Sequence, residues 1–311
     1  MKNEIVIGTR GSDLAMYQAD SVIQAIRSRY PGITVRKSII KTKGDKILDV
    51  ALSKIGDKGL FTKELETELI NKNIDIAVHS LKDLPTRFPG GLALGGVLSR
   101  GEFRDALVHI DGKKFSQLDE NDIIATSSLR RRAQLLRHNP SFRITDIRGN
   151  INTRLQKMHD GHCSAMVMAA AGLQRLKLDH HITEILDHEE FIPAVGQGAI
   201  AMEVREEDHA IMELLGKVGH LPTLMAVTAE RIFLRKLEGG CQIPIGCYTQ
   251  INGNKFRIEG FISNIDATVV LRDFREGSPD QSNELALALA DSFIERGSEK
   301  ILEEIRKHNK S

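Results

Sequence analysis

The chain has 311 residues, and its 43 Lys and Arg against 42 Asp and Glu give a formal net charge of +1. This balance excludes a nucleic-acid binder that works through overall positive charge, and no Trp with only three Tyr leaves few rings for base stacking. The uncharged runs are shorter than the roughly 20 apolar residues of a membrane span, so we expect neither nucleic acid nor membrane as a partner.

Length and cysteine content narrow the class of protein further. At roughly 150 residues per domain, the length predicts two or three domains. The first residues lack the apolar core of a signal peptide, and three cysteines (Cys163, Cys241 and Cys247) are too few for a disulfide framework. The sequence therefore predicts a cytoplasmic protein with reduced thiols.

Strand and helix patterns alternate along the first hundred residues. Residues 5–8 have the apolar pattern of a short buried strand, and Ser12 can cap the helix that follows, whose apolar residues recur with a period of 3.6. Further strands are predicted at 35–40 and 74–78, with a helix at 62–71. This alternation is typical of βαβ units, in which the strands are mostly parallel.

Two irregular segments interrupt the alternation. Residues 98–105 are polar, and residues 193–198 combine a Pro with two Gly before an apolar strand at 199–204. We expect the chain to cross there between two lobes, first outward and then back, which implies a cleft with a double hinge. The second lobe is expected to contain strands at 123–126, 142–147 and 164–169 and helices at 129–138 and from Asn150 onward.

The last ninety residues follow a different pattern. A long helix is predicted at 223–237, Asn252 and Gly253 indicate a hairpin, and strands at 256–262 and 268–274 are expected to pair antiparallel before two amphipathic helices. The predicted fold class is therefore α/β with three domains: two lobes like those of solute-binding proteins, with mostly parallel sheets, and a small α+β domain. Their expected bounds are 1–98 plus 199–216, then 104–192, then 221–311.

Arginines are concentrated where predicted strands end and helices begin. Arg10 follows the first strand, residues 130–132 are three arginines that open a helix, and Arg148 precedes a helix that carries Arg154 in its first turn. Free N–H groups and the helix dipole favour anions at these positions, and guanidinium forks match carboxylate or phosphate. Three arginines in a row can also form a solvated helix face, but the repeated placement predicts a site for a small polyanion.

Two further residues are candidates for chemistry. Asp83 lies beside Lys82 just after a predicted strand, where a carboxylate can stabilise a cationic intermediate or exchange protons; it can equally be an ordinary turn residue before Pro85. Cys241 follows two glycines at a helix end, where a thiol is more reactive than in a core. A buried structural thiol is the default expectation for Cys163 and Cys247.

Two motifs have the spacing of a site without its context. His159, His162 and Cys163 resemble zinc ligands, but their segment has the composition of a turn and no second ligand pair follows, so no metal is predicted. Residues 196–201 spell GxGxxA, but a strand pattern follows where a dinucleotide fold needs a helix.

Eight segments in order along the chain resemble the porphobilinogen deaminase family, also called hydroxymethylbilane synthases. The resemblance implies a transferase that condenses four porphobilinogen molecules head to tail into hydroxymethylbilane, with release of ammonia, in porphyrin and heme biosynthesis. It also implies a monomer whose dipyrromethane cofactor, one per chain, is held by Cys241 through a thioether. The segments are residues 9–15, 58–66, 75–85, 126–135, 148–155, 169–176, 193–203 and 237–246.

Site residues follow from the same resemblance, position by position. Asp83 is implied as the catalytic residue: ammonia loss leaves an azafulvenium cation, a pyrrole α-carbon attacks it, and one ionised carboxylate stabilises the positive states. The implied cofactor-binding residues are Cys241, Lys82, Ser128, Arg130, Arg131, Arg148, Gly149 and Arg154. The implied substrate-binding residues are Arg10, Ser12, Arg148, Arg154, Arg175 and Gln197.

A rival hypothesis from a different class is a non-enzymatic anion-binding module with two lobes. It accounts for the arginines and for the two crossings, but it gives no role to Asp83 or Cys241. The mass of the denatured chain distinguishes the two, because only the enzyme carries a covalent cofactor.

Overall fold

The computed structural model describes residues 3–46, 59–237 and 243–308. The chain forms two compact units, which are described separately. Of the described residues, 3–46, 59–101 and 198–225 form unit 1, and 102–197, 226–237 and 243–308 form unit 2.

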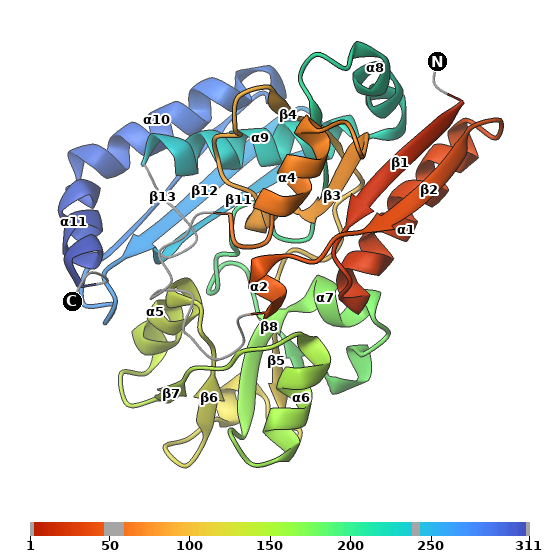
Figure 1. Ribbon diagram of the computed structural model, residues 1–311. Coiled ribbons are helices and arrows are strands. Elements are labelled where there is room, and N and C mark those ends of the chain that lie inside the picture. Colours follow the sequence, from red (N-terminus) through yellow and green to blue (C-terminus); the bar gives the residue numbers. More distant parts are fainter. Residues whose placement is uncertain (1–2, 47–58, 238–242, 309–311) are drawn as a thin grey trace. The chain divides into compact units, whose positions relative to one another are not determined.

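Unit 1 is built on a mixed sheet with the strand order β2-β1-β3-β10-β4. Strand β1 pairs in parallel with both β2 and β3, whereas β10 is antiparallel to both of its neighbours. Because β4 is antiparallel to β10, it runs in the same direction as β1, β2 and β3, so the sheet is mostly parallel, as predicted, and the first three strands end at the same edge (red and orange in Figure 1). The strands are β1 Glu4–Thr9, β2 Thr34–Ile39, β3 Ile76–Ser80, β4 Leu92–Val97 and β10 Ile200–Arg205.

Helices cover both faces of this sheet. On one face, β3 residues Ile76 and Val78 share a core with α1 and α8, whereas Ala77, which lies between them, packs with Leu65 and Leu69 of α4 on the other. Because both faces are covered there, the inner strands β1 and β3 are largely apolar and buried, as is typical of parallel sheets, whereas the edge strand β2 is mostly polar and partly exposed. The helices of unit 1 are α1 Asp13–Arg29, α2 Lys43–Lys46, α4 Lys63–Ile70 and α8 His209–Val218, with the 3-10 turn η1 Leu81–Asp83.

The first sheet of unit 2 repeats this topology, with the order β7-β6-β8-β5-β9. Strand β6 pairs in parallel with β7 and β8, and β5 is antiparallel to β8 and β9. In both sheets the antiparallel strand, β5 or β10, is the first one after the chain changes unit, at Gly101–Glu102 and at Gln197–Gly198. The strands are β5 Asp105–His109, β6 Ile123–Ala125, β7 Arg143–Thr145, β8 Ala165–Ala169 and β9 Glu184–Ile185.

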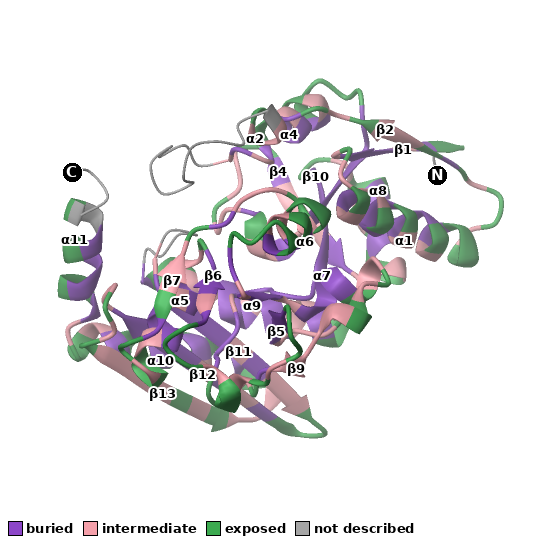
Figure 2. Cartoon of the chain, turned by 90° about the horizontal axis from the view of Figure 1, so that it is seen from below, coloured by how far each residue is buried: buried purple, intermediate pink, exposed green. Residues whose placement is uncertain are grey.

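Alternate strand residues of this second sheet also face different helices. Leu107 and Val167 pack with Leu135 of α5, whereas Val108 and Met166 pack in the core of α6 and α7. The purple of β5, β6 and α7 in Figure 2 marks this burial. The helices are α5 Leu129–His138, α6 Ile151–His159 and α7 Ala170–Arg175, with the 3-10 turns η2 Phe115–Gln117 and η3 Asp179–His181.

The second sheet of unit 2 is antiparallel, in the order β11-β12-β13. Asn252 pairs with Lys255, so Gly253 and Asn254 form the tip of the predicted hairpin, and Gly253 adopts the positive φ of 59° that such a turn needs. Phe293 of α10 packs edge-on against Phe233 at 5.2 Å between ring centroids. The elements are β11 Ile245–Asn252, β12 Lys255–Ser263, β13 Val270–Gly277, α9 Leu221–Lys236, η4 Pro279–Gln281, α10 Ser282–Glu295 and α11 Ser298–His308.

The α/β class, the mostly parallel sheets and the antiparallel C-terminal sheet are as predicted. The division into three domains and the double hinge stay predictions. Within the described residues, no single helix has the length and hydropathy to cross a membrane; α8 and α9 meet that test only when combined as a bent pair, by length and composition.

Candidate active site

Four of the predicted site residues lie at one edge of the unit 1 sheet. Arg10 directly follows β1 and Ser12 caps α1, while Lys82 and Asp83 belong to the turn after β3. Because β1 and β3 are parallel neighbours, their carboxyl ends lie at the same edge. In open α/β sheets this edge is where ligands bind.

Asp83 lies on a turn that is anchored on both sides. Leu81 and Leu84 are 1% and 4% exposed, and the Leu81 N–H donates to the carbonyl of Ala199 at 3.1 Å. The Leu84 N–H closes the turn on the carbonyl of Leu81, also at 3.1 Å. The Asp83 side chain is exposed, so a ligand can approach this carboxylate while the backbone below it is held in the core.

Ser12 and Arg10 offer two kinds of hydrogen-bond donor at the same edge of the sheet. The Ser12 hydroxyl oxygen accepts a hydrogen bond from the Ala15 N–H at 3.4 Å, which leaves its own O–H to donate to an anion. The Arg10 guanidinium donates to Asp45, with Nη2 to Oδ1 at 2.5 Å, and lies over the ring of Phe61 at 4.1 Å. Partial burial acts to raise the pKa of Asp45, but the hydrogen bonds from Arg10 and Thr42 outweigh it, so this pKa lies below its usual value.

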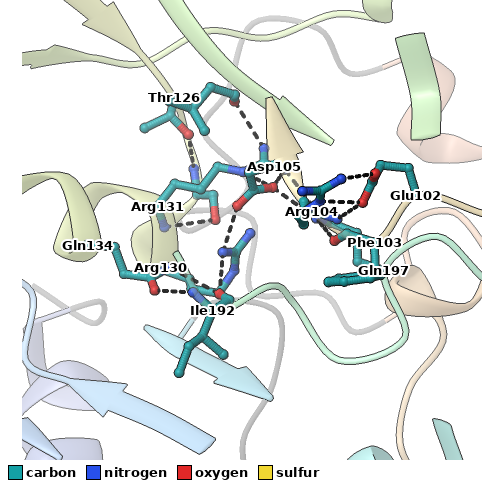
Figure 3. A network of polar contacts seen from close by, with 12 residues as sticks. Glu102, Phe103, Arg104, Asp105, Thr126, Arg130, Arg131, Gln134, Ile192 and Gln197 are labelled. Carbon is teal, nitrogen blue, oxygen red and sulfur yellow. Dashed lines mark hydrogen bonds and ion pairs between the residues drawn. The ribbon is translucent and has the colours of Figure 1, made fainter. Parts of the chain in front are cut away.

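In unit 2 the adjacent arginines Arg130 and Arg131 share one buried carboxylate (Figure 3). Arg130 Nη1 lies 2.8 Å from Asp105 Oδ2, and Arg131 Nη2 lies 2.7 Å from Oδ1. The two guanidiniums also donate to the carbonyls of Ile192 and Val167, at 2.7 and 3.2 Å. Burial alone acts to raise the pKa of Asp105, but the two guanidinium charges outweigh it and hold this pKa below its usual range.

This cluster keeps an excess of positive charge, because two guanidiniums face one carboxylate. Gln197 is fully buried in it: its Nε2 donates to Asp105 Oδ1 at 2.9 Å and to the carbonyl of Phe103 at 2.8 Å, and its Oε1 accepts from Arg131 at 3.3 Å. The structure thus brings Arg130, Arg131 and Gln197 together, each with protein partners. Their predicted contacts with ligands stay predictions.

The N-terminus of α6 is a second cationic feature of unit 2. Gly149 has a φ of 114°, and the side chain of Asn150 caps the helix by accepting from the Thr153 N–H at 2.8 Å. Arg154 Nε donates back to the carbonyl of Gly149 at 2.9 Å, which fixes its guanidinium beside the cap. Burial lowers the pKa of Arg148, so a carboxylate bound beside this side chain would stabilise its charged form.

The remaining unit 2 residues follow the neighbouring strands. Ser128 caps α5 after β6, and its hydroxyl oxygen accepts from the Arg131 N–H at 3.5 Å. Arg175 is the half-buried last residue of α7, which begins directly after β8. Since β6, β7 and β8 are parallel, Ser128 and the α6 N-terminus lie at the carboxyl edge of their sheet.

The described cysteines are buried and form no disulfide. Cys163 and Cys247 are 4% and 0% exposed, and burial raises the pKa of Cys163 to about 11. Cys241 lies outside the described residues. The segment around His162 is a turn, and in the described parts of the chain no group of His, Cys, Asp or Glu side chains is arranged to hold a metal. Strand β10 follows Gly198 where a dinucleotide site needs a helix, so that alternative is wrong.

Sequence reasoning missed Asp105, Asp45 and Phe61, which hold the predicted arginines. Asp105 had one signal, an acidic residue at the head of the apolar segment that forms β5. Phe61 lies in the resembling segment 58–66, but the resemblance assigned it no role, and Asp45 had no signal, because acidic residues in polar segments are common in any chain.

The fold and the site define an α/β protein that presents guanidiniums and capped helix N-termini, a donor set suited to a small molecule with several carboxylates. A family model described as "Porphobilinogen deaminase, dipyromethane cofactor binding domain" matches residues 5–213, and one described as "Porphobilinogen deaminase, C-terminal domain" matches residues 224–295. The chain belongs to the porphobilinogen deaminase family.

Relatives match the chain from end to end. Porphobilinogen deaminase of Carboxydothermus hydrogenoformans is 45% identical over 307 residues, which cover 99% of each chain. Porphobilinogen deaminase of Chlorobium limicola is 45% identical over 311 residues, again 99% of each chain. Among solved structures, the methionine-binding protein MetQ is similar at a TM-score of 0.45 and 14% identity over 74% of this chain and 93% of its own.

Proposed function

We propose that this chain condenses four porphobilinogen molecules head to tail into hydroxymethylbilane and releases ammonia at each condensation. The observation that carries the proposal is the exposed carboxylate of Asp83 on its anchored turn, at the same sheet edge as Arg10, in a chain that belongs to the porphobilinogen deaminase family. An anion-binding module needs the arginines but has no use for an accessible carboxylate among them, so family and geometry favour the enzyme.

Asp83 supplies the negative charge that this reaction needs. Loss of ammonia leaves a cation spread over the substrate pyrrole ring, and a further positive state forms after attack, before the attacking pyrrole loses the proton of its α-carbon. A fixed carboxylate stabilises each of these states, because it is already oriented when the charge develops. Leu81 and Leu84 keep the turn in place, so little reorganisation is required during the reaction.

Arginines keep the substrate carboxylates away from that cation. Porphobilinogen carries an acetate and a propionate, and each would compete with Asp83 for the positive charge if it were free to move. Arg10 and the Ser12 hydroxyl offer donors for these groups in unit 1. In unit 2, Arg148, Arg154 and Arg175 are assigned to the same task.

The donor set of unit 2 fits a dipyrromethane cofactor. The cluster of Arg130 and Arg131 on Asp105 has one guanidinium charge in excess, and the Ser128 O–H and the capped α6 N-terminus add donors for carboxylates. When bound, the group supplies the pyrrole α-carbon to which substrate is joined. The residues assigned to hold it are Lys82, Ser128, Arg130, Arg131, Arg148, Gly149 and Arg154, with Cys241 as its attachment point.

Burial of the other thiols supports the attachment to Cys241. Cys163 and Cys247 lie in hydrophobic cores, where neither sulfur can bond to a bulky group without unfolding. Intact mass of the denatured chain tests this point: we expect an increment of one dipyrromethane that Cys241→Ser abolishes. An increment that survives this substitution would contradict the assignment.

Asp83→Asn tests the proposed reaction. We expect a folded enzyme that keeps the cofactor mass but loses nearly all turnover of porphobilinogen, because the amide has the same shape without the charge. Asp20→Asn is the matched control, since Asp20 is an exposed carboxylate of unit 1 that pairs with Lys37. Normal turnover of the Asp83 variant would remove this residue from the reaction.

The proposal also includes a cytoplasmic monomer. Neither described cysteine forms a disulfide, which agrees with a reducing compartment. Sedimentation equilibrium tests the oligomeric state, and a concentration-independent mass of one chain is the expected result.

A further inference from the structure

The Arg10 guanidinium is held on two sides by residues of its own unit. Asp45 Oδ1 accepts from Nε at 3.2 Å and from Nη2 at 2.5 Å, and the ring of Phe61 covers one face at 4.1 Å. Within the described residues, no group hydrogen-bonds Nη1, and the Arg10 side chain is 23% exposed. Arg10 therefore keeps one donor group available in a fixed direction.

Asp45 is itself fixed before any ligand arrives. Its Oδ2 accepts from the Thr42 hydroxyl at 2.8 Å and from the Thr42 N–H at 3.2 Å, and Thr42 is fully buried. These bonds prevent the carboxylate from following Arg10 to another position. Because Asp45 already accepts these two hydrogen bonds from Thr42, it competes less with a ligand carboxylate for the Arg10 guanidinium.

Phe61 and Asp45 are parts of one packed arrangement. Gly44, which precedes Asp45 in the chain, packs directly against Phe61, since a Cβ at this position would lie 2.2 Å from Cε1 of Phe61. The Gly44 N–H donates to the carbonyl of Leu60 at 2.9 Å, so the backbones before Asp45 and before Phe61 are joined directly. The edge contact and the face contact on Arg10 therefore form together.

We propose that Asp45 is a positioning residue for substrate binding, which holds Arg10 so that its Nη1 group meets one carboxylate of porphobilinogen. The inference rests on the proposed function. A guanidinium has five N–H donors, and Asp45 engages only the Nε and Nη2 side, so both carboxylates can bind at the same time. An arginine that is already ordered loses less conformational freedom when it binds a ligand.

The opposite hypothesis, that Asp45 competes with substrate for Arg10, predicts the opposite sign of the effect. A positioning role predicts that Asp45→Ala raises KM about 3- to 10-fold, the cost of ordering one long side chain on binding. We expect kcat to change by less than about twofold, because Asp45 touches no reacting atom. Asp45→Asn keeps one oxygen for Thr42 or Arg10 and should raise KM by a smaller factor.

A double-mutant cycle with Arg10→Lys shows whether Asp45 acts through Arg10. A Lys ammonium cannot form the edge-on contact, so Asp45→Ala should add almost nothing to the KM of the Arg10→Lys enzyme. All variants are assayed as holoenzymes, with the cofactor mass and circular dichroism verified. Asp20→Asn, which removes another acid of unit 1 that pairs with Lys37, should leave KM unchanged.

The outcomes separate this inference from the proposed function. If Asp45→Ala lowers KM or leaves it unchanged while Arg10→Lys raises it, the positioning role is wrong and Arg10 still binds substrate. If Asp45→Ala raises KM by the same factor in the wild-type and the Arg10→Lys enzymes, Asp45 does not act through Arg10, and the inference is also overturned. If Arg10→Lys itself leaves KM unchanged, Arg10 does not bind substrate, and the inference about Asp45 is overturned with that assignment.

Discussion

Asp105→Asn removes the charge that two buried guanidiniums share. Asp105 is fully buried, and the asparagine carbonyl can accept from either Arg130 or Arg131 but not from both, while its NH₂ group faces the other guanidinium. Removing one partner of a buried ion pair costs about 3–5 kcal/mol, because the remaining charge is left uncompensated. At about 2–4 °C per kcal/mol for a protein of this size, the melting temperature should fall by roughly 10 °C.

The pH dependence of this loss has a definite sign. The folded pKa of Asp105 lies below its usual value of about 4, so the carboxylate stabilises the fold above that pH and loses this effect as the pH falls through the folded pKa. The difference in melting temperature between the variant and the wild type should therefore have its full size at pH 7 and become smaller only in strong acid.

Thermal unfolding followed by circular dichroism measures both effects. Asp20→Asn is the control, because Asp20 forms an exposed ion pair with Lys37 at 2.6 Å and such pairs contribute about 0–1 kcal/mol. A melting temperature for Asp105→Asn within about 2 °C of this control would refute the reasoning. The buried cluster would then be too flexible or too hydrated to hold an unpaired charge.

Two further predictions concern backbone strain and thiol burial. Gly149→Ala should destabilise the protein in urea by about 1–3 kcal/mol, because φ is 114° and the new Cβ would lie 2.6 Å from Thr153 Cγ2. Gly161→Ala, where φ is 83° and nothing lies within 4 Å, contains the strain without the clash and should cost less; equal losses would exclude the clash as a cause. Cys163 and Cys247 should resist a maleimide at pH 7 and at pH 9 in the native protein and react after denaturation, since both are buried and the pKa of Cys163 is about 11; rapid native labelling, located by peptide mass, would contradict this.

Local signals predicted much of the fold. The helix α5 begins and ends at the predicted residues, and Ser12, Ser128 and Asn150 all cap helices through their side chains. Each of these caps joins residues only three positions apart, so a local sequence pattern can identify it.

Elements that depend on distant partners were missed. Strand β4 contains Gly95 and Gly96, which weaken a strand pattern, and both lie close to Leu215 of α8, a helix that no sequence pattern predicted. A Cβ at Gly95 would lie 2.8 Å from Leu215 Cδ1, so the glycines serve the packing of a helix more than a hundred positions later. Short strands with such requirements are recognised only once the sheet is assembled.

The same distinction applies to the site. The sequence placed arginines at the strand ends, but the carboxylates that orient them are 35 positions away for Arg10 and 26 for Arg131. Nothing in the pattern connects these acids to their arginines, because an acid and a base far apart in a chain meet only through the tertiary fold.

Burial gives the two acid–arginine contacts different roles. Asp105 is fully buried, where charges interact strongly and an unpaired guanidinium would be costly, so its two arginines are fixed as part of the fold. The side chains of Asp45 and Arg10 are 30% and 23% exposed, so water screens this ion pair and its strength is modest. Arg10 can therefore share its charge with an incoming carboxylate that is released again after the reaction, whereas Arg130 and Arg131 suit a group that stays bound. The exposure of each pair thus matches the residence time of the ligand to which it is assigned.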